Sequence, residues 1–161
     1  MNTLAPSDRP KSLLTMILVT GLLVGSFDAA AAVIQFIIPT WRNPARIFTY
    51  IASGVFGTDA FSAGDIMAVI GLLFHYFIAT AWTSLFFTVY PRVPWLTKNK
   101  VAGGLLYGVL IWLTMNLVVL PLSNVPHFPI RITGAATGML ILMLVVGLPI
   151  SLRAHKYYSN K

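Results

Sequence analysis

Two ionisable side chains, Asp28 and His75, lie within long apolar stretches of this sequence. Placing such a group inside a bilayer costs about 2.5–3.5 kcal/mol on insertion scales, so each is a candidate functional residue. If the first stretch is helical, Asp28 shares a face with small residues at spacings of three and four: Gly21, Gly25 and Ala32. Helices approach each other closely at small residues, so we expect Asp28 to point into a helix bundle.

His75 lies near the middle of its stretch, and its expected depth differs from that of Asp28 by about 7 Å, close to one helical turn. A carboxyl–imidazole pair would satisfy both groups, and because histidine titrates near neutral pH the pair could also carry protons. Two interpretations remain open: hydrogen-bonded contacts that hold helices together, or transport of a proton or a solute. We predict no metal site, since a metal needs three or four ligands; a haem would have to share one histidine from each of two chains.

Further polar and small residues could complete this cluster. Asn116 and Thr137 are expected in the same half of the bundle as Asp28 and His75. Polar contacts between membrane helices average only about 0.6 kcal/mol, so helix packing is an alternative role for both. Glycines four residues apart predict close packing or self-association: Gly21 and Gly25, Gly104 and Gly108, Gly134 and Gly138.

The residues on which most enzymes rely are missing. The sequence has no cysteine, and its four acidic residues are all aspartates, which excludes thiol chemistry and a pair of glutamates. No phosphate-binding loop, HExxH motif or GxSxG motif occurs. We therefore predict that the protein is not an enzyme, with no catalytic residue, no metal and no cofactor.

The composition is typical of a protein whose solvent is the lipid bilayer. The chain has 161 residues, of which 57% are apolar and 9% charged, whereas soluble domains carry about 25% charged residues. The mean hydropathy is +0.81. A soluble fold of this composition would expose large apolar patches and aggregate. The length favours a single integral membrane domain, residues 1–161.

Four apolar stretches are long enough to cross a bilayer as helices: 12–38, 66–90, 101–120 and 132–152. At about 1.5 Å per residue, each reaches or exceeds the roughly 30 Å of hydrocarbon. Strands are excluded because lipid-exposed sheet edges do not occur in membranes. The basic N-terminus and Ala29–Ala32 also resemble a signal peptide, but the apolar run continues to Ile38, which favours an uncleaved first helix. The predicted fold is an all-α four-helix bundle.

A shorter helix is predicted between the first and second spans, at about 44–56. Asn43-Pro44 is typical of a helix start and Gly57 of a helix end. The polar residues form one stripe at helical spacing: Arg42, Arg46, Thr49 and Ser53. We expect an amphipathic helix that lies in the membrane interface or packs against the bundle, as a connector or as a partner-binding element.

Positive charge is distributed unequally between the two ends of the predicted bundle. Eight of the eleven Lys and Arg residues fall in the N-terminal segment, the loop after the second span and the C-terminal tail, and three fall in the other two loops. The positive-inside rule then predicts that both termini are cytoplasmic. This explains the net charge of +7 without nucleic acid, which is not an expected partner. Aromatic residues at the ends of the spans, among them Trp41, Tyr90 and Tyr157, are expected at the lipid headgroups.

Four segments resemble small uncharacterised bacterial inner-membrane proteins of the YagU-like group: YIASGVFG (Tyr50–Gly57), GLLFHYFIA (Gly71–Ala79), VYPRVPWL (Val89–Leu96) and YGVLIWLTMNLVVLPLS (Tyr107–Ser123). The shared pattern is a histidine early in one span, an aromatic-rich exit before a proline loop, and a glycine-rich span that ends in Pro-Leu. The resemblance implies a bacterial inner-membrane location and a role in envelope stress or acid tolerance. It implies no catalytic residue.

The expected function is that of a non-enzymatic membrane protein that acts by structure or interaction. Its expected partners are membrane lipids and either a second copy of the chain or a larger membrane complex. The alternative is a small transporter, or a conduit for protons or a solute, built on the polar cluster of Asp28, His75, Asn116 and Thr137. A water-filled cavity that reaches Asp28 would favour conduction, whereas a fully packed core would favour a structural role. Four helices are few for a transporter monomer, so conduction would favour a dimer.

Overall fold

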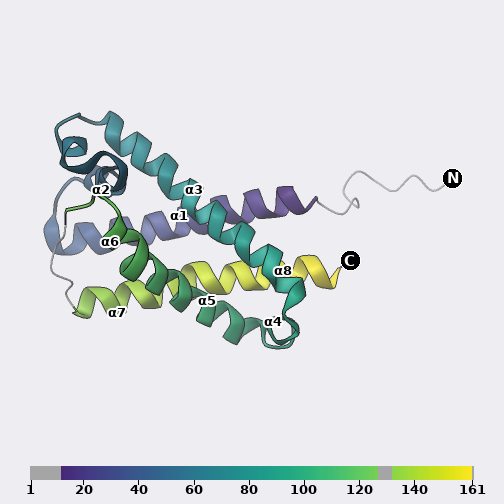
Figure 1. Cartoon of the computed structure of the whole chain (residues 1–161). Coiled ribbons are helices and arrows are strands. Elements are labelled where there is room, and N and C mark those ends of the chain that lie inside the picture. Colours follow the sequence, from purple (N-terminus) through teal and green to yellow (C-terminus); the bar gives the residue numbers. More distant parts are fainter. Residues whose placement is uncertain (1–11, 127–131, 161) are drawn as a thin grey trace.

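The structure, a computed structural model, describes residues 12–126 and 132–160, and the regular elements in these ranges are all helices (Figure 1). Four helices are long and apolar enough to cross a membrane. The first is α1 (Leu13–Thr40) and the second is α3 (Ile66–Val89). The prediction of an all-α chain with four candidate membrane-spanning helices is therefore confirmed.

The third and fourth spans are continuous helices that change their hydrogen-bond register part-way. The third consists of α5 (Lys100–Thr114), a π-helical turn (Met115–Val119) and α6 (Leu120–Leu122). The fourth consists of α7 (Ile132–Ile141), a second π-helical turn (Leu142–Gly147) and α8 (Leu148–Ser159). The last helix therefore continues well beyond the predicted end of the span at residue 152.

A proline explains each π-helical turn. The N–H groups of Leu120 and Leu148 bond to carbonyls five residues back, and Pro121 and Pro149 come next in the chain. Proline has no N–H, and its ring collides with the carbonyl four residues earlier, so the helix widens over the preceding turn. Such turns are frequent at functional sites, and both of these contribute residues to one cavity between the spans.

Short helices connect the spans at the two ends of the bundle. α2 (Ala45–Phe56), followed by a 3₁₀ turn (Gly57–Phe61), joins α1 to α3, and α4 (Pro94–Lys98) lies between α3 and α5. The start of α1, α4 and the end of α8 lie at one end of the bundle, here called the terminal end (Figure 1). The helices α2 and α6 and the start of α7 lie at the opposite end, here called the α2 end.

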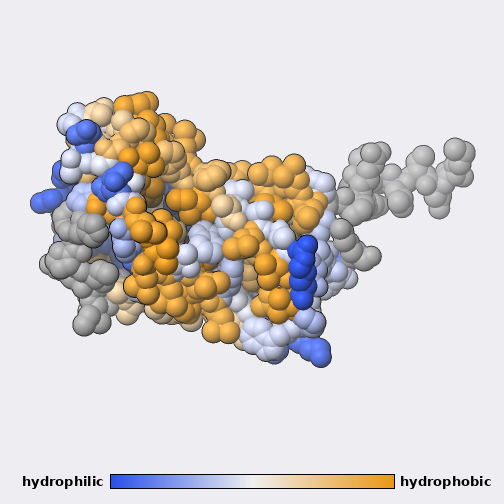
Figure 2. Space-filling view, viewed as in Figure 1, coloured by the Kyte–Doolittle hydropathy of each residue, from blue (hydrophilic) through white to orange (hydrophobic). Residues whose placement is uncertain are grey.

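The surface between the two ends is apolar, as a lipid-facing surface requires. Figure 2 shows hydrophobic residues over the middle of one face, with the most hydrophilic residues toward the two ends. The side chains of Leu22, Phe77 and Leu106 are 53%, 74% and 59% exposed. In water such a surface would favour aggregation, whereas in a bilayer the hydrocarbon covers it.

α2 begins and ends as the sequence predicts. The Asn43 side chain accepts a hydrogen bond from the Ala45 N–H (2.9 Å), and Gly57, with a φ of 64°, ends the helix. The end of α2 is also tied to the segment after α6, because the backbone N–H of Asn124 donates to the Gly54 carbonyl (3.0 Å). The side-chain amide of Asn124 donates to the Val55 carbonyl (3.2 Å).

α2 packs against α3. At Gly71 the two helices lie so close that a Cβ atom would collide with the carbonyl of Phe48. Ala52 and Ser53 are fully buried, whereas Arg46 is exposed. The predicted polar stripe therefore runs from the surface at Arg46 into the protein at Ser53, because packing on α3 decides which face is covered. α2 was predicted to lie in the membrane interface or to pack against the bundle. In the structure it packs against the bundle, and its depth in a membrane stays a prediction.

The closest contact between spans joins α5 to the second π-helical turn. A Cβ atom on Gly108 or Gly147 would collide with the facing backbone, and one on Gly104 would lie 2.8 Å from the Leu148 Cα. Since these glycines have no side chain, the two backbones touch. Gly147 was not among the predicted packing residues. Gly134 was, yet nothing described lies within 4 Å of its Cβ position.

The remaining predicted glycines face neighbouring helices. A Cβ atom on Gly21 would lie 2.9 Å from the Thr80 Cα, so α1 and α3 are in close contact there. A Cβ atom on Gly25 would lie 3.0 Å from the ring of Tyr76. Gly138 makes only an ordinary contact with a tryptophan ring, at 3.5 Å.

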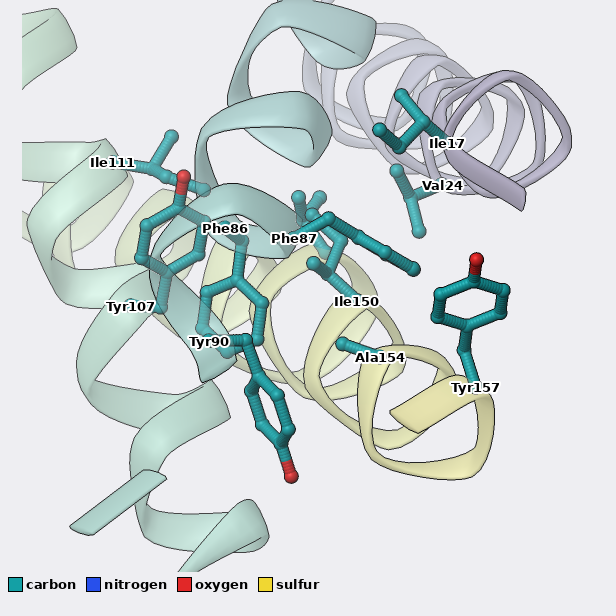
Figure 3. Packing of buried hydrophobic residues seen from close by; sticks show 11 residues of the cluster. Ile17, Val24, Phe86, Phe87, Tyr90, Tyr107, Ile111, Ile150, Ala154 and Tyr157 are labelled. Carbon is teal, nitrogen blue, oxygen red and sulfur yellow. The ribbon is translucent and has the colours of Figure 1, made fainter. Parts of the chain in front are cut away.

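The aromatic core of the bundle lies toward the terminal end, where Phe86 and Tyr90 of the second span pack with Ile150 of α8 (Figure 3). Tyr90 and Tyr157 are only 1% and 9% exposed, so their side chains pack inside the protein and not against lipid, and their depth in a membrane stays a prediction. The physical reason is that a tyrosine can be buried when its hydroxyl finds a partner. The Tyr90 hydroxyl is hydrogen-bonded to Nδ1 of His155 (2.8 Å).

Candidate functional site

A cavity of about 300 Å³ lies between the four spans, next to the aromatic core on the side of the α2 end. Its polar lining residues are Asp28 and Gln35 of α1, His75 of α3 and Asn116 of the third span. The structure therefore brings three of the four residues of the predicted polar cluster to one cavity. Most of the other lining residues are apolar.

Thr137, the fourth predicted residue, lies outside the cavity lining. Its side chain is exposed, and its hydroxyl donates a hydrogen bond to the Thr133 carbonyl (2.9 Å). The neighbouring Gly138 lines the cavity instead. Successive residues of a helix differ by about 100° of rotation, so α7 turns Thr137 away from the site.

His75 is held at the cavity wall by a hydrogen bond to α1. Its Nε2 lies 2.8 Å from the carbonyl oxygen of Gly25. A carbonyl only accepts, so Nε2 carries a proton, and Nδ1 remains as an acceptor or, in the charged ring, as a second donor. The rings of Phe48 and Tyr76 pack edge-on against the imidazole, with centroid distances of 6.3 and 5.6 Å.

Asp28 follows Gly25 by three residues, about one helical turn, and lines the same cavity as His75. The carboxyl and the imidazole interact electrostatically. Among the residues that the structure describes, none makes a hydrogen bond or an ion pair with the Asp28 carboxyl, and no described lysine or arginine lines the cavity. The charge of a carboxylate here would therefore have to be balanced by a protonated His75 or a bound cation, or be solvated by water.

Three more residues of the site were not among the predicted members of the polar cluster: Gln35, Trp82 and Trp112. Gln35 and Trp82 each come seven residues, about two helical turns, after Asp28 and His75. Trp112 comes about one turn before Asn116, whose side-chain amide donates to the Trp112 carbonyl (2.9 Å). Helical spacing from Asp28, His75 and Asn116 is thus the sequence signal that indicates these three residues.

A larger hollow adjoins the cavity at the α2 end. It has a volume of about 560 Å³, shares Ala32 and Gln35 with the cavity, and is lined also by Arg42 and Arg46. Tyr50 of α2 lines it as well, and burial raises the pKa of this phenol above its usual value. This hollow is therefore positively charged, in contrast to the cavity.

A second, apolar groove adjoins the cavity on the exposed surface of the bundle. It has a volume of about 290 Å³ and shares Ile78, Trp82 and Met115 with the cavity. Phe77, which is 74% exposed, and Leu85 also line it. The wall between this groove and the cavity is thus formed by side chains of α3 and of the first π-helical turn.

The polar contacts at the terminal end have a different character. Nε of Arg153 donates to the Thr20 hydroxyl (3.0 Å), and the hydroxyl of Tyr90 is bonded to His155, so these residues tie α8 to α1 and to the end of α3. They are partnered and lie at the end of the bundle. Across the described ranges, no group of three or more His, Cys, Asp or Glu residues gathers where it could hold a metal ion.

Comparison with known proteins found no family model, no curated protein and no solved structure that matches this chain. The resemblance to the YagU-like group therefore stays a prediction, and so does the bacterial inner-membrane location that it implies. The candidate site rests on its own geometry.

Proposed function

We propose that this chain is a small multi-pass transporter of the bacterial inner membrane, in which Asp28 and His75 carry a proton and the cavity beside them accommodates a small solute. The observation that supports this most directly is the cavity of about 300 Å³ that reaches Asp28. A carboxyl that only holds helices together is expected to pack against a hydrogen-bond partner, because unpaired buried polar groups are costly. Asp28 faces a hollow space instead.

The two side chains are suited to exchange a proton. A protonated Asp28 beside a neutral His75 leaves the cavity uncharged, which is the favourable state in a medium of low dielectric constant. Loss of that proton creates a carboxylate that a protonated imidazole or a bound cation can balance. Because Nε2 of His75 is bonded to Gly25, Nδ1 is the nitrogen that gains and loses the proton.

We expect the site to be reached from the α2 end. Val24, Ile111 and Val146 line the cavity and also belong to the packed core, so the core closes the cavity toward the terminal end. Toward the α2 end, the cavity adjoins the hollow at Ala32 and Gln35. With the predicted orientation, the site would exchange protons with the outside of the cell in this conformation. Transport across the membrane would require a second conformation that opens the terminal end.

Proton flux into liposomes tests the proposal. The full-length protein is reconstituted into vesicles that enclose a pH-sensitive dye, and a pH gradient is imposed. We expect the wild type to dissipate the gradient faster than empty vesicles, Asp28→Asn to abolish the effect and His75→Gln to slow it. Asp59→Asn, an exposed aspartate in the turn after α2, is the matched control and should behave as the wild type. Equal flux through Asp28→Asn and wild type would refute the proposal.

A structural or interaction role, including one in envelope stress, is the second candidate. The contact that favours it is the direct packing of α5 on the fourth span at Gly104, Gly108 and Gly147, where the two helix backbones touch. This role requires no proton exchange at Asp28. The flux experiment therefore separates the two candidates.

A further inference from the structure

We infer that the solute of this cavity is a lipophilic organic amine in its cationic form, a compact ammonium group attached to an apolar body. This inference rests on the proposed function and names its substrate class. On binding, the ammonium ion pairs with the Asp28 carboxylate, and the proton that Asp28 held is released. The exchange is balanced: one cation enters, one proton leaves, and no bond of the amine is made or broken.

The charge of the lining selects a cation. Asp28 is an acid without an ion-pair partner in the described part of the chain, and no described lysine or arginine lines the cavity. The other titratable side chain, His75, already donates its Nε2 proton to Gly25. Asn116 donates one N–H of its side-chain amide to the Trp112 carbonyl, and its Oδ1 can accept a hydrogen bond. The Asp28 carboxylate and Oδ1 of Asn116 accept hydrogen bonds, and an ammonium donates them.

The walls of the cavity favour a ligand that combines an apolar body with a cationic group, because the cation can pack against aromatic rings. Trp82 and Trp112 both line it, and indole is the aromatic group that binds cations best. Trp82 is fixed in place because its carbonyl accepts a hydrogen bond from the Tyr107 hydroxyl (2.7 Å) and its ring packs edge-on against that of Tyr107 (centroids 5.9 Å apart). The other lining residues are mostly aliphatic, such as Ile78 and Ile141.

The size of the cavity limits the ligand. Small-molecule sites have volumes of about 300–1,000 Å³, and the cavity of about 300 Å³ lies at the lower limit. It can hold a single aromatic ring with a short aminoalkyl chain. A phospholipid or a peptide does not fit.

The surroundings of the cavity favour entry from the lipid. The positively charged hollow at Arg42 and Arg46 would repel a cation at the α2 end. The apolar groove on the exposed surface of the bundle meets the cavity at Trp82 and Met115, and a lipophilic amine partitions into the bilayer that covers this groove. Met115 is a flexible side chain and the first residue of a π-helical turn, so the wall is adaptable where the ligand would pass.

A series of three ligands with the same body and different charge tests the inference. Phenethylammonium, 2-phenylethanol and phenylacetate are titrated into the full-length protein in lipid nanodiscs at pH 8, with binding followed by calorimetry. We expect phenethylammonium to bind at least about tenfold more tightly than the other two, a difference that one ion pair readily supplies. Titrations in buffers of different ionisation enthalpy should show that binding releases protons, and the affinity should fall as the pH is lowered.

Substitutions of the lining residues test which side chains contribute to binding of the amine. Asp28→Asn should remove both the preference for the ammonium and the proton release, whereas Asp59→Asn should change neither. Trp112→Leu should weaken phenethylammonium binding, and Trp112→Phe should restore part of it because a ring is retained. Near-UV circular dichroism checks that each variant keeps its fold.

The outcomes distinguish this inference from the function on which it rests. If the wild type binds the alcohol or the carboxylate as tightly as the amine, the substrate class is wrong. If it binds the amine without releasing a proton, the exchange at Asp28 is wrong. If none of the three ligands binds while Asp28-dependent proton flux is observed, the amine class is wrong and the proton function stands. If Asp28→Asn conducts protons as the wild type does, the proposed function is wrong, whatever the amine does.

Discussion

Nε2 of His75 lies 2.8 Å from the carbonyl oxygen of Gly25, on the turn of α1 that precedes Asp28. This contact joins the two helices that carry the ionisable residues of the site. It also assigns the imidazole proton to Nε2, because the partner is a carbonyl. The relationship therefore sets both the position of His75 and the nitrogen that can exchange a proton, and each consequence can be tested separately.

Substitution of His75 separates its structural contact from its titration. In His75→Gln the side-chain amide can donate to the Gly25 carbonyl, so we expect stability within about 0.5 kcal/mol of wild type but slower proton flux. In His75→Leu the contact is lost, and we expect a loss of about 0.6–1.7 kcal/mol, the range of polar contacts between membrane helices. Unfolding in detergent measures the stability of each variant, and dye-loaded liposomes measure its proton flux. Full flux through His75→Gln would show that the imidazole does not carry the proton.

Substitution of Asp28 distinguishes a functional carboxyl from one that holds helices together. Because Asp28 faces a cavity with mostly apolar walls, we expect Asp28→Leu to be as stable as wild type or more stable. A loss of about 1–2 kcal/mol would indicate a structural contact instead. Asp28→Asn should leave the fold intact and abolish proton flux. Survival of an acid challenge by cells that carry Asp28→Asn, equal to that of wild type, would eliminate the proton-handling role.

The backbone contact between α5 and the fourth span predicts a strong effect of one methyl group. In Gly147→Ala the new Cβ would collide with the backbone of α5, so we expect a loss of about 1–3 kcal/mol, as for other overpacked sites. Gly134→Ala is the matched control, since its Cβ meets no described atom within 4 Å and alanine favours helix. Equal stabilities of the two variants in detergent would mean that the α5 contact is looser than described.

The distribution of basic residues predicts the orientation. A reporter that matures only in the cytoplasm should be active when it is fused after Lys161 and inactive when it is fused after Phe61, at the end of the 3₁₀ turn that follows α2. The two fusions are controls for each other, because Phe61 and the end of α8 lie at opposite ends of the bundle. The reverse pattern would place the hollow with Arg42 and Arg46 in the cytoplasm.

The sequence predicts the spans well and the faces of the helices less well. The limits of α3 agree with the predicted stretch 66–90, and α2 starts two residues after Asn43 and ends just before Gly57. Asp28, His75 and Asn116 were predicted as a cluster and line one cavity. Thr137 was assigned to the same cluster and points away from it. One residue along a helix is about 100° of rotation, so a small error in the facing direction excludes a side chain from a site.

The sequence by itself determined that this chain is helical and that four of its helices suit a membrane. The physical reason is that a bilayer offers no hydrogen bonds to the backbone, so an apolar stretch of sufficient length must form a helix whatever its neighbours are. Only the tertiary structure decided that the space beside Asp28 stays open, that Gly147 touches the backbone of α5, and that Tyr90 is buried against His155. Each of these depends on how two helices that are distant in the sequence rotate and approach each other, and helices with apolar residues all around leave that choice to packing.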